Sequence, residues 1–576
     1  MDYSVLAETY EALEKEPSKL KKAAIIADFL KKTPKDELEM SVLLLRGTVF
    51  PGYSQMELGI ADKMVMRAIA KATGFSESDI VEKFKKTGDL GLTAEECLRS
   101  KKQATLARKK VTLDFVFNDM RKLASMEGGG SQDRKLNLIA EMIVSARPVE
   151  ARYIIRTILS NLRVGASDGI IRDAIVSAFL FENGDGEKEV SDERKRVKKE
   201  ATDAVDYALN VVADFGEVAR IAREKGVSGL RKVKIEIGKP IQVMLAEKAE
   251  SLDDVLKKYK KVAIEWKFDG MRAQVHKKGD RIWVFTRRLE DVTNQFPDIV
   301  KAMREAIRAE ECVIEGEALA INAKTGEPLP FQSLSQRVQR KYDIERMAKE
   351  IPIQMNMFDA IYVDGELMLD KPFAERREML SKILKTVPKK VQLAKQIVTE
   401  DLKDAEKFYE SALEARQEGV MLKVLDSPYV FGRHVDGWVK IKPVMETLDL
   451  VIVGATWGEG ARANWLTSFV LACRDPDTER LLECGMMSTG LSEEEYSEMT
   501  KTLEPLIIDE SGKDVVVKPK IVIEVQYQEI QKSPTYSSGY ALRFPAFKTI
   551  RPDKGRDDAD TISRVKKLYE SQGRAG

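Results

Sequence analysis

Apolar residues recur at helical spacing through residues 1–237 of the chain. Leu6, Tyr10 and Leu13 form one such set, and strict alternation of apolar and polar residues is rare in this part. Side chains three or four positions apart lie on the same face of a helix, so the pattern predicts amphipathic helices that bury one face. Residues 1–237 are therefore predicted to form an all-α domain.

Two segments interrupt the helical pattern and predict loops. They are the glycine-rich segment 128–131 and the charged stretch 183–200. A third break, the sequence Gly-Lys-Pro at 238–240, separates the helical part from a region of different character. We expect a domain boundary there.

Short β-rich runs alternate with helical segments between the break and residue 445, which predicts a mixed α/β domain over 238–445. The runs are VAIEWK, RIWVFTRR, ECVIEGEALA, QMNMFDAIYV, GVMLKVL and WVKIKP. From residue 447 the pattern is almost entirely strand, and about five strands in this space suit a small barrel such as an OB-fold. The predicted third domain covers 446–576 and ends in an amphipathic helix near 558–572.

Composition narrows the class of protein without naming it. The chain has 576 residues, 43% hydrophobic and 33% charged, with 95 basic and 94 acidic side chains, which is typical of a multidomain globular protein. No apolar run approaches the roughly 20 residues that span a bilayer, and the N-terminus lacks the features of a signal peptide. Four scattered cysteines and two histidines exclude a disulfide framework and three-histidine zinc chemistry. We expect a cytoplasmic monomer without membrane contact.

The sequence Glu265-Trp-Lys267-Phe-Asp-Gly-Met-Arg272 carries the most specific chemistry in the chain. Alternation along a strand puts Glu265 and Lys267 on one face, and Asp-Gly then forms a turn. A lysine amine is a covalent nucleophile when its environment lowers its pKa, and a neighbouring cation such as Arg272 has that effect. The alternative is an exposed lysine at the end of a strand before an ordinary turn.

Five later segments each end a predicted strand with charged or aromatic side chains. They are WVFTRR (283–288), CVIEGE (312–317), QMNMFD (354–359), EGVMLK (418–423) and WVKIK (438–442). In the last of these, Lys440 and Lys442 share one strand face, with Val439 and Ile441 on the other. Taken singly, each segment is most simply a solvated strand edge. Together they collect the lysines, arginines, glutamates and aromatic ring that a nucleotide site requires.

This ordered set resembles the motifs of the nucleotidyltransferase superfamily, and most closely those of ATP-dependent DNA ligases of the archaeal and eukaryotic replicative type. The segment KFDGMR matches the family pattern KxDGxR, and the five later segments match the remaining motifs in order. The resemblance covers essentially the whole chain. It implies a multidomain protein with an all-α DNA-binding domain, an α/β adenylation (nucleotidyltransferase) domain and a β-barrel OB-fold domain.

The resemblance also implies a role for each matching residue. Lys267 would attack the α-phosphate of ATP and carry AMP, which then passes to the 5′-phosphate of nicked double-stranded DNA before the 3′-hydroxyl seals the break. Phe358 would stack on adenine, and Glu317 and Glu418 would hold Mg²⁺. Other implied contacts with the nucleotide or its phosphates come from Glu265, Arg272, Arg287, Glu317, Arg433, Lys440, Lys442 and Arg551. Such an enzyme serves DNA replication, repair and recombination.

Two of the motifs depart from the family pattern. Glu315 stands where the third motif usually has aspartate. In the last motif, Ala546 and Thr549 occupy positions where basic residues are common, although Arg551 and the following Asp-x-Lys sequence remain. In the family this segment closes over the site and orients pyrophosphate; the alternative is a basic surface loop.

Arginines in the helical part are candidates for DNA contact. Arg152, Arg156 and Arg163 fall at i, i+4 and i+11, which on a continuous helix is one face, and such a row contacts successive phosphates without reading sequence. The alternative is a solvated face with ion-pair partners. A second basic segment, 99–110, occupies the region where related ligases carry a sliding-clamp-binding segment, but Gln103 to Leu106 lacks the usual aromatic pair.

Other classes of protein share part of this pattern. An mRNA capping enzyme or an RNA ligase shares the lysine motif but usually lacks the long helical N-terminal domain, and an NAD-dependent DNA ligase normally brings a cysteine zinc site. A non-catalytic DNA-binding scaffold would be expected to have lost Lys267 or the later acidic and basic motif residues. The pattern leaves open whether ADP or NAD⁺ also serves as donor, which metal is preferred and at what temperature the protein works.

Overall fold

The computed structural model describes residues 1–54, 56–100, 109–181, 192–329, 331–338, 343–432, 437–443, 447–458 and 462–571. The chain forms two compact units. Unit 1 consists of Met1–Leu245, Gly270–Ala394 and Asp426–Asp436, and unit 2 of Ala246–Asp269, Lys395–Leu425 and Gly437–Gly576. The chain passes from unit 2 into unit 1 directly after the KFD of the lysine motif.

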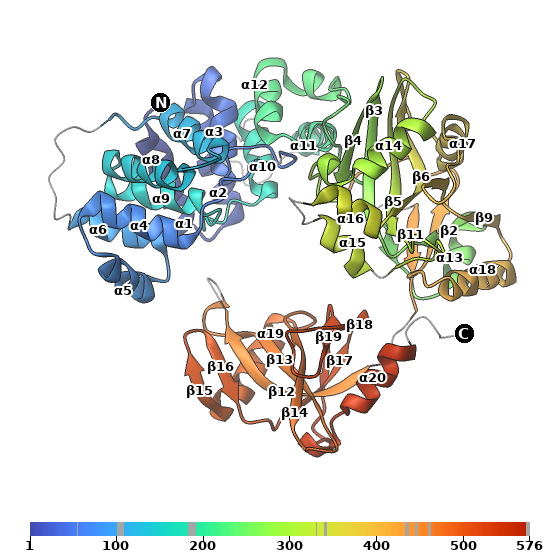
Figure 1. The fold of residues 1–576 in the computed structure, drawn as a ribbon. Coiled ribbons are helices and arrows are strands. Elements are labelled where there is room, and N and C mark those ends of the chain that lie inside the picture. The colour runs from blue at the N-terminus through green and yellow to red at the C-terminus, as the bar shows by residue number, and fades with distance from the viewer. Residues whose placement is uncertain are drawn as a thin grey trace. The chain divides into compact units, whose positions relative to one another are not determined.

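The first part of unit 1 is helical, as the sequence predicts (Figure 1). Its helices are α1 (Tyr3–Lys15), α2 (Lys19–Lys32), η1 (Lys35–Glu37), α3 (Leu38–Leu45), α4 (Asp62–Thr73), α5 (Glu77–Thr87), α6 (Leu90–Arg99), α7 (Leu113–Ser125), α8 (Ser131–Ser145), α9 (Pro148–Ile158), α10 (Asp168–Phe179), α11 (Asp192–Val212) and α12 (Phe215–Arg231). Leu6, Tyr10 and Leu13 are fully buried in the common core of these helices. Helical spacing therefore identified the buried face of α1 correctly.

The charged stretch 183–200 is not a loop throughout, because α11 begins at Asp192. Glutamate, lysine and arginine are good helix formers, so a highly charged segment is compatible with a helix once its other end is packed. Ala201, Ala204 and Val205 supply that packing further along the same helix. The predicted loop at 128–131 is confirmed as far as Gly130, which has a left-handed backbone and precedes α8.

The second part of unit 1 is a sheet with strand order β4-β3-β5-β6-β7, with β8 beside β6. Its strands are β3 (Met271–Lys278), β4 (Arg281–Thr286), β5 (Glu311–Ala320), β6 (Ile353–Val363), β7 (Glu366–Leu367) and β8 (Val391–Leu393). Its helices are η2 (Thr293–Gln295), α14 (Pro297–Ala306), α15 (Phe331–Val338), α16 (Ile344–Glu350) and α17 (Phe373–Ile383). Met271, Ala273 and Val275 of β3 pack into the core with α14 and α17, so the alternate residues of β3 lie on the opposite face of the sheet.

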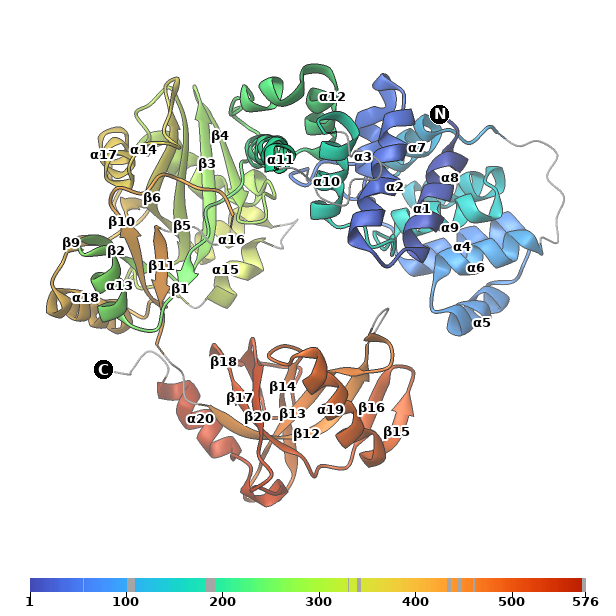
Figure 2. The same ribbon diagram turned by 180° about the vertical axis from the view of Figure 1, so that it is seen from behind.

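The first part of unit 2 is a five-stranded sheet of order β1-β11-β10-β2-β9 (Figure 2). Its elements are β1 (Glu247–Lys248), α13 (Leu252–Tyr259), β2 (Val262–Lys267), β9 (Gln396–Thr399), α18 (Leu402–Glu414), β10 (Gly419–Val424) and β11 (Trp438–Ile441). Ile264, Leu422 and Val439 lie on the face that α13 and α18 cover. The other face of the three central strands carries the polar residues.

The second part of unit 2 is rich in strands. They are β12 (Leu448–Trp457), β13 (Leu466–Arg474), β14 (Leu481–Met487), β15 (Ile507–Ser511), β16 (Asp514–Val517), β17 (Val522–Gln526), β18 (Glu529–Lys532), β19 (Tyr540–Arg543) and β20 (Ala546–Ile550). The helices are α19 (Glu493–Leu503), η4 (Glu504–Leu506), η5 (Arg556–Asp558) and α20 (Ile562–Ser571). More strands form than the pattern predicts: the single apolar run around 515–530 divides into β16, β17 and β18, and β15, β19 and β20 form in addition.

The coarse fold prediction is confirmed: the chain has a helical N-terminal region and a sheet-rich C-terminal part. β3 is the principal strand left out of the sequence prediction, although Met271, Ala273 and Val275 alternate with polar residues as in a strand with one face in the core. Among the described residues, no helix combines the length and apolar character needed to cross a bilayer.

Candidate active site

Lys267 ends β2 on the polar face of the unit 2 sheet. β10 lies between β2 and β11, with Met421 opposite both Glu265 and Lys440, and Gly419 opposite Lys267. Residues opposite one another in an antiparallel pair share a face of the sheet. Glu265, Met421 and Lys440 therefore form one row across the three strands, and Lys267 and Gly419 belong to the neighbouring row on the same face. The predicted alternation along the two strands is confirmed, because Val439 and Ile441 lie in the core beneath.

Gly419 keeps the space between Lys267 and the end of β11 open. Its backbone has φ +133°, and a Cβ at this position would lie 2.2 Å from the carbonyl oxygen of Ile441. A side chain other than hydrogen does not fit. The glycine therefore allows β10 to approach the end of β11 closely. Next to it, the Glu418 backbone N–H donates to the carbonyl oxygen of Lys267 at 2.9 Å.

The Glu418 carboxylate lies between two lysines. One oxygen, Oε2, accepts a hydrogen bond from Lys267 Nζ and lies 2.6 Å from Lys442 Nζ. Burial alone would raise the pKa of Glu418, but the charges of Lys267 and Lys442 outweigh it and lower the pKa to about 2. The side chains of these lysines are 21% and 28% exposed, so the cluster is accessible from solvent on one side.

Asp269, two residues beyond the lysine, has the opposite shift. Burial raises the pKa of the Asp269 carboxyl to about 7, and the negative charges of Glu418 and Glu529 act in the same direction. At neutral pH the Glu418 carboxyl is ionised, whereas the Asp269 carboxyl, with a pKa of about 7, is partly protonated. The cluster around Lys267 is therefore sensitive to pH.

Glu265 lies on the same face as Lys267 but is held within the sheet. Its carboxylate accepts a hydrogen bond from Gln396 at 2.9 Å and lies 2.7 Å from Lys423 Nζ, and the side chain is 3% exposed. Lys423 also lies over the ring of Trp438, 4.1 Å from its centroid. The nucleotide contact predicted for Glu265 stays a prediction. Lys423 was not predicted as the partner of Glu265, although Lys423 and Gly419 lie on the same face of β10.

A second cluster of predicted residues lies on the sheet of unit 1. Arg272 on β3 is directly opposite Glu317 on β5. The Arg272 guanidinium carbon lies 5.4 Å from the centroid of the Phe358 ring, which is 8% exposed. Arg272 is predicted to contact the base, ribose or phosphates of the nucleotide, and Phe358 is predicted to stack on the adenine. The two side chains are close neighbours in the structure. Glu315, the residue that departs from the family pattern, is fully buried and binds Arg272 at 2.6 Å.

Arg287 and Arg551, two further arginines predicted to contact the nucleotide or its phosphates, lie in different surroundings from each other. Arg287 follows β4 directly and is exposed. Arg551 follows β20 and pairs with Asp449 at 3.0 Å and Asp553 at 2.8 Å. The hydrogen bonds from Arg551 lower the pKa of Asp553 to about 2. Arg551 is therefore part of a local ion-pair cluster, and its function as a lid residue stays a prediction.

Some predictions lie outside the described residues. Arg433 falls in the segment 433–436, and the proposed clamp-binding residues Gln103 and Leu106 fall in 101–108.

The prediction of an exposed arginine row on one helix is wrong. α9 ends at Ile158, and Ser160 and Arg163 have left-handed backbone conformations with φ +54° and +59°. The chain therefore leaves the helix before Arg163, and a spacing of i+11 no longer indicates a shared face. The Arg163 side chain is 38% exposed, with one carboxylate, that of Asp89, 3.6 Å away.

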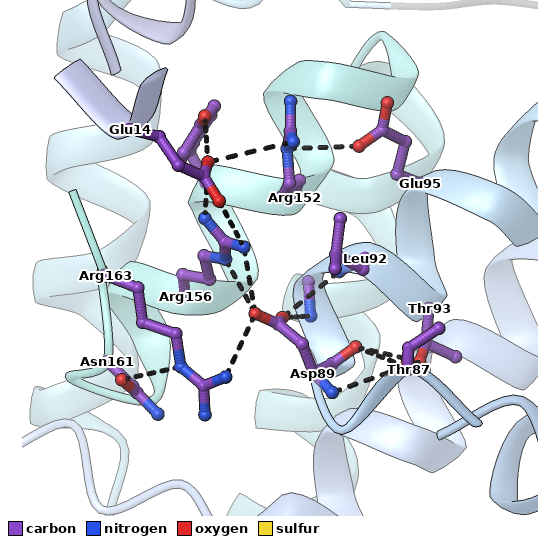
Figure 3. A network of polar contacts seen from close by, with 12 residues as sticks. Glu14, Thr87, Asp89, Leu92, Thr93, Glu95, Arg152, Arg156, Asn161 and Arg163 are labelled. Atoms are coloured by element: carbon purple, nitrogen blue, oxygen red, sulfur yellow. Dashed lines mark hydrogen bonds and ion pairs between the residues drawn. The ribbon is translucent and has the colours of Figure 1, made fainter. Parts of the chain in front are cut away.

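Arg152 and Arg156 point into the protein rather than outward (Figure 3). Arg156 is 4% exposed and lies 3.0 Å from Glu14 and 2.9 Å from Asp89. Arg152 is 11% exposed and lies 2.8 Å from Glu11 and 3.1 Å from Glu95. These ion pairs join α9 to α1 and α6, which is a structural role.

The carboxylates predicted to bind a metal are single residues in each cluster. Glu317 lies in unit 1 and Glu418 in unit 2. In the described part of the chain, no group of three or more histidine, cysteine, aspartate or glutamate side chains has a metal-binding arrangement. Each carboxylate is by its chemistry a donor that suits Mg²⁺, which keeps several waters and needs only one or two protein carboxylates when phosphate oxygens complete its shell.

Comparison with known proteins identifies the family. Three family models match in order: DNA ligase N terminus over residues 2–176, ATP dependent DNA ligase domain over 243–442, and ATP dependent DNA ligase C terminal region over 462–554. A DNA ligase of Nanoarchaeum equitans is 46% identical, with 99% of each chain covered. A DNA ligase of Thermococcus onnurineus is 45% identical, with 100% of this chain and 99% of that one covered.

The chain belongs to the ATP-dependent DNA ligase family. The resemblance drawn from the six motifs is confirmed. The match of the N-terminal model removes the capping-enzyme and RNA-ligase alternatives, which rested on the lysine motif alone.

Solved structures support the fold of this family member. The structure titled Pmar-Lig_PreS3 is 17% identical, covers 95% of this chain and 99% of its own, and has a TM-score of 0.56. A second, titled Pmar-Lig_Pre., is 16% identical over 95% of this chain and 99% of its own, with a TM-score of 0.57. At this identity the likeness concerns the fold alone.

Proposed function

We propose that this protein is an ATP-dependent DNA ligase that seals nicks in double-stranded DNA, with Lys267 as the residue that carries AMP. The observation that supports this most strongly is the convergence of Lys267 and Lys442 on the Glu418 carboxylate, with Lys440 on the same sheet face. Three lysine amines on one face of the sheet suit a phosphate. In this proposal residues 238–445 act as the nucleotidyltransferase domain and 446–576 as the OB-fold domain.

The first step is attack by the neutral amine of Lys267 on the α-phosphorus of ATP. The new P–N bond forms as the bond to the bridging oxygen of pyrophosphate breaks, and the amine loses a proton. Lys267 Nζ donates a hydrogen bond to the Glu418 carboxylate, so the amine leaves this bond before it attacks the phosphorus. Lys440 and Lys442 stabilise the negative charge that develops on the phosphate.

The second and third steps use the same site. The 5′-phosphate of the nick attacks the phosphorus of the lysine adenylate, the P–N bond breaks and Lys267 is regenerated. The 3′-hydroxyl then attacks the activated 5′-phosphate and AMP leaves. Phe358 holds the adenine ring, and Arg272 and Arg287 contact the nucleotide or the phosphates; Arg551 acts when pyrophosphate is the leaving group.

Glu317 and Glu418 are the proposed Mg²⁺ ligands. Bound Mg²⁺ supplies positive charge beside the phosphate oxygens. Arg163, the most exposed of the three arginines in the helical region, is the remaining candidate there for DNA contact. A monomeric state, cytoplasmic location and clamp binding through 99–110 also stay predictions.

The test is an intact mass measurement after incubation with ATP and Mg²⁺, on protein first stripped of AMP with pyrophosphate. We expect a gain of one AMP with ATP and none with GTP. Lys267→Ala should remove the gain completely, because no other amine takes its position. Lys278→Ala is the matched control, since Lys278 also ends a strand but is 63% exposed and pairs with Glu311.

A gain of AMP in Lys267→Ala would disprove the assignment of the nucleophile. No gain in the wild type with any nucleotide would favour a non-catalytic DNA-binding scaffold. Sealing of a labelled nicked duplex, followed on a denaturing gel, then tests the complete reaction.

A further inference from the structure

Three polar residues on one face of β3 bind the main chain of the linker segment, residues 238–245. Arg272, Gln274 and His276 alternate along the strand, opposite the face that packs into the core. In an antiparallel sheet such a row is usually solvated. Here Gln274 and His276 are 1% and 0% exposed, and the linker segment follows the helical region directly.

Each of the three side chains engages a different part of the linker segment. Gly238 N–H donates to His276 Nδ1 at 3.1 Å. Ile241 N–H donates to Gln274 Oε1 at 2.9 Å, and Gln274 Nε2 donates to the Ile241 carbonyl oxygen at 3.2 Å. Arg272 Nη1 donates to the Met244 carbonyl oxygen at 2.6 Å. The linker segment is thus fastened by hydrogen bonds along the length of β3.

Tyr429 completes the attachment at the end nearest Arg272. Its hydroxyl accepts from the Met244 N–H at 2.9 Å and donates to Glu315 Oε2, also at 2.9 Å. The same oxygen of Glu315 accepts from Arg272 Nη2 at 2.6 Å. Arg272 is therefore held from two directions, by the Met244 carbonyl and by a carboxylate that Tyr429 orients.

Buried polar groups of this kind are costly unless every partner is present. Glu315 is fully buried and Tyr429 is 3% exposed. Glu315, longer by one methylene than the aspartate usual at this position in the family, reaches both Tyr429 and Arg272. Removal of one hydroxyl would leave the Met244 N–H and one oxygen of Glu315 each without that partner.

We propose that Tyr429 and the main chain of Met244 position Arg272 for the nucleotide, so that the linker segment is coupled to nucleotide binding. The proposal rests on the function assigned to Arg272 above. Tyr429 is a positioning residue, because it acts through Glu315 and Arg272. Coupling of this kind is reciprocal: whatever orders the linker segment favours nucleotide, and nucleotide orders the linker segment.

The first test is Tyr429→Phe in the full-length protein, which keeps the ring that packs beside Phe431 and Arg376. We expect the KM for ATP in lysine adenylylation to rise about tenfold, the effect of losing one hydrogen bond to a charged group, with a smaller change in kcat. The matched control is Tyr10→Phe, whose buried hydroxyl donates to the Leu44 carbonyl oxygen at 2.6 Å within the helical region. That variant should lose stability without a change in KM.

The second test needs no variant. Addition of ATP and Mg²⁺ to the wild type should slow amide hydrogen exchange in residues 238–245, and Tyr429→Phe should reduce this protection. Equal KM values for the two tyrosine variants, or exchange in the linker segment that does not respond to ATP, would overturn the proposal. A wild type that forms no lysine adenylate would instead overturn the proposed function.

Discussion

Two clusters of basic residues in this protein have similar sequence signatures and opposite structural outcomes. In the helical region, Arg152 and Arg156 lie among four carboxylates, all within ion-pair distance, and are nearly buried. In the unit 2 sheet, Lys267 and Lys442 share a single carboxylate, that of Glu418, and remain partly exposed. The first cluster is balanced and holds helices together. The second is partly open to solvent, so its amines can contact a phosphate.

In these two clusters, the number and burial of the carboxylates around a cation decide whether it stabilises the fold or can bind a ligand. Breaking a buried ion pair leaves an uncompensated charge and costs stability, whereas removing a cation from an accessible cluster costs mainly the interaction with its ligand. Substitutions in the two clusters should therefore change different measurements.

The largest effect beyond the loss of Lys267 is expected from Lys442→Ala. Removing one preorganised cation beside the reacting phosphate should slow lysine adenylylation about 100-fold, with little change in the thermal midpoint. Single-turnover mass measurement gives the rate. Lys257→Ala is the control, because Lys257 lies on α13 in the same unit, is 71% exposed and pairs only with Asp253 among described carboxylates within ion-pair distance.

A Lys442→Ala variant with the wild-type rate of adenylylation would contradict the assignment of Lys442 to phosphate binding. Loss of stability with an unchanged rate would make this cluster resemble the arginine cluster.

Arg156→Ala should have the reverse signature. The Arg156 side chain is 4% exposed, and its loss removes the buried partner of Glu14 and Asp89. The free energy of unfolding should therefore fall by about 3–5 kcal/mol. Adenylylation of Lys267 in the folded protein should not change. Denaturant unfolding of the full-length protein measures the first quantity and the mass gain measures the second.

Arg163→Ala is the matched control for Arg156→Ala. Arg163 is 38% exposed, so its pair with Asp89 should contribute under about 1 kcal/mol. If Arg163 contacts DNA, its loss should weaken nick binding at low salt and reduce the dependence of affinity on salt. Equal destabilisation by both substitutions would remove the distinction drawn between the two arginines.

The last expected effect concerns pH. The pKa of Asp269 is raised to about 7 from an ordinary value of 3.8, so the folded protein binds a proton that the unfolded chain releases. Its contribution to stability is present below pH 3.8 and is lost as pH rises to about 7, by roughly 4 kcal/mol at most. Asp269→Asn should therefore be more stable relative to the wild type at pH 8 than at pH 4, as measured by thermal unfolding. An equal difference at both pH values would contradict the raised pKa.

Much of the candidate site follows from local rules. Alternation along β2 and β11 placed Lys267 and Lys440 on polar faces, and the core on the opposite faces confirms this. The order of the six motifs identified the family before any fold was known. Helical spacing likewise located the buried face of α1. Each of these predictions depends on residues close together in the chain.

Other features could not be predicted in this way. The fate of Arg156 depends on Glu14 and Asp89, which come from distant helices. The alternation along β3 likewise does not show that its polar residues bind a separate segment rather than solvent.

The sequence by itself determined the family, the helical and sheet-rich parts, and the strand faces that carry Lys267, Lys440 and Lys442. Only the tertiary structure decided which cations are neutralised, that Gly419 lies against the end of β11, and that Tyr429 and Met244 hold Arg272. The reason is physical: periodicity fixes where a side chain points relative to its own strand or helix, whereas charge balance and burial depend on which distant segments pack against it.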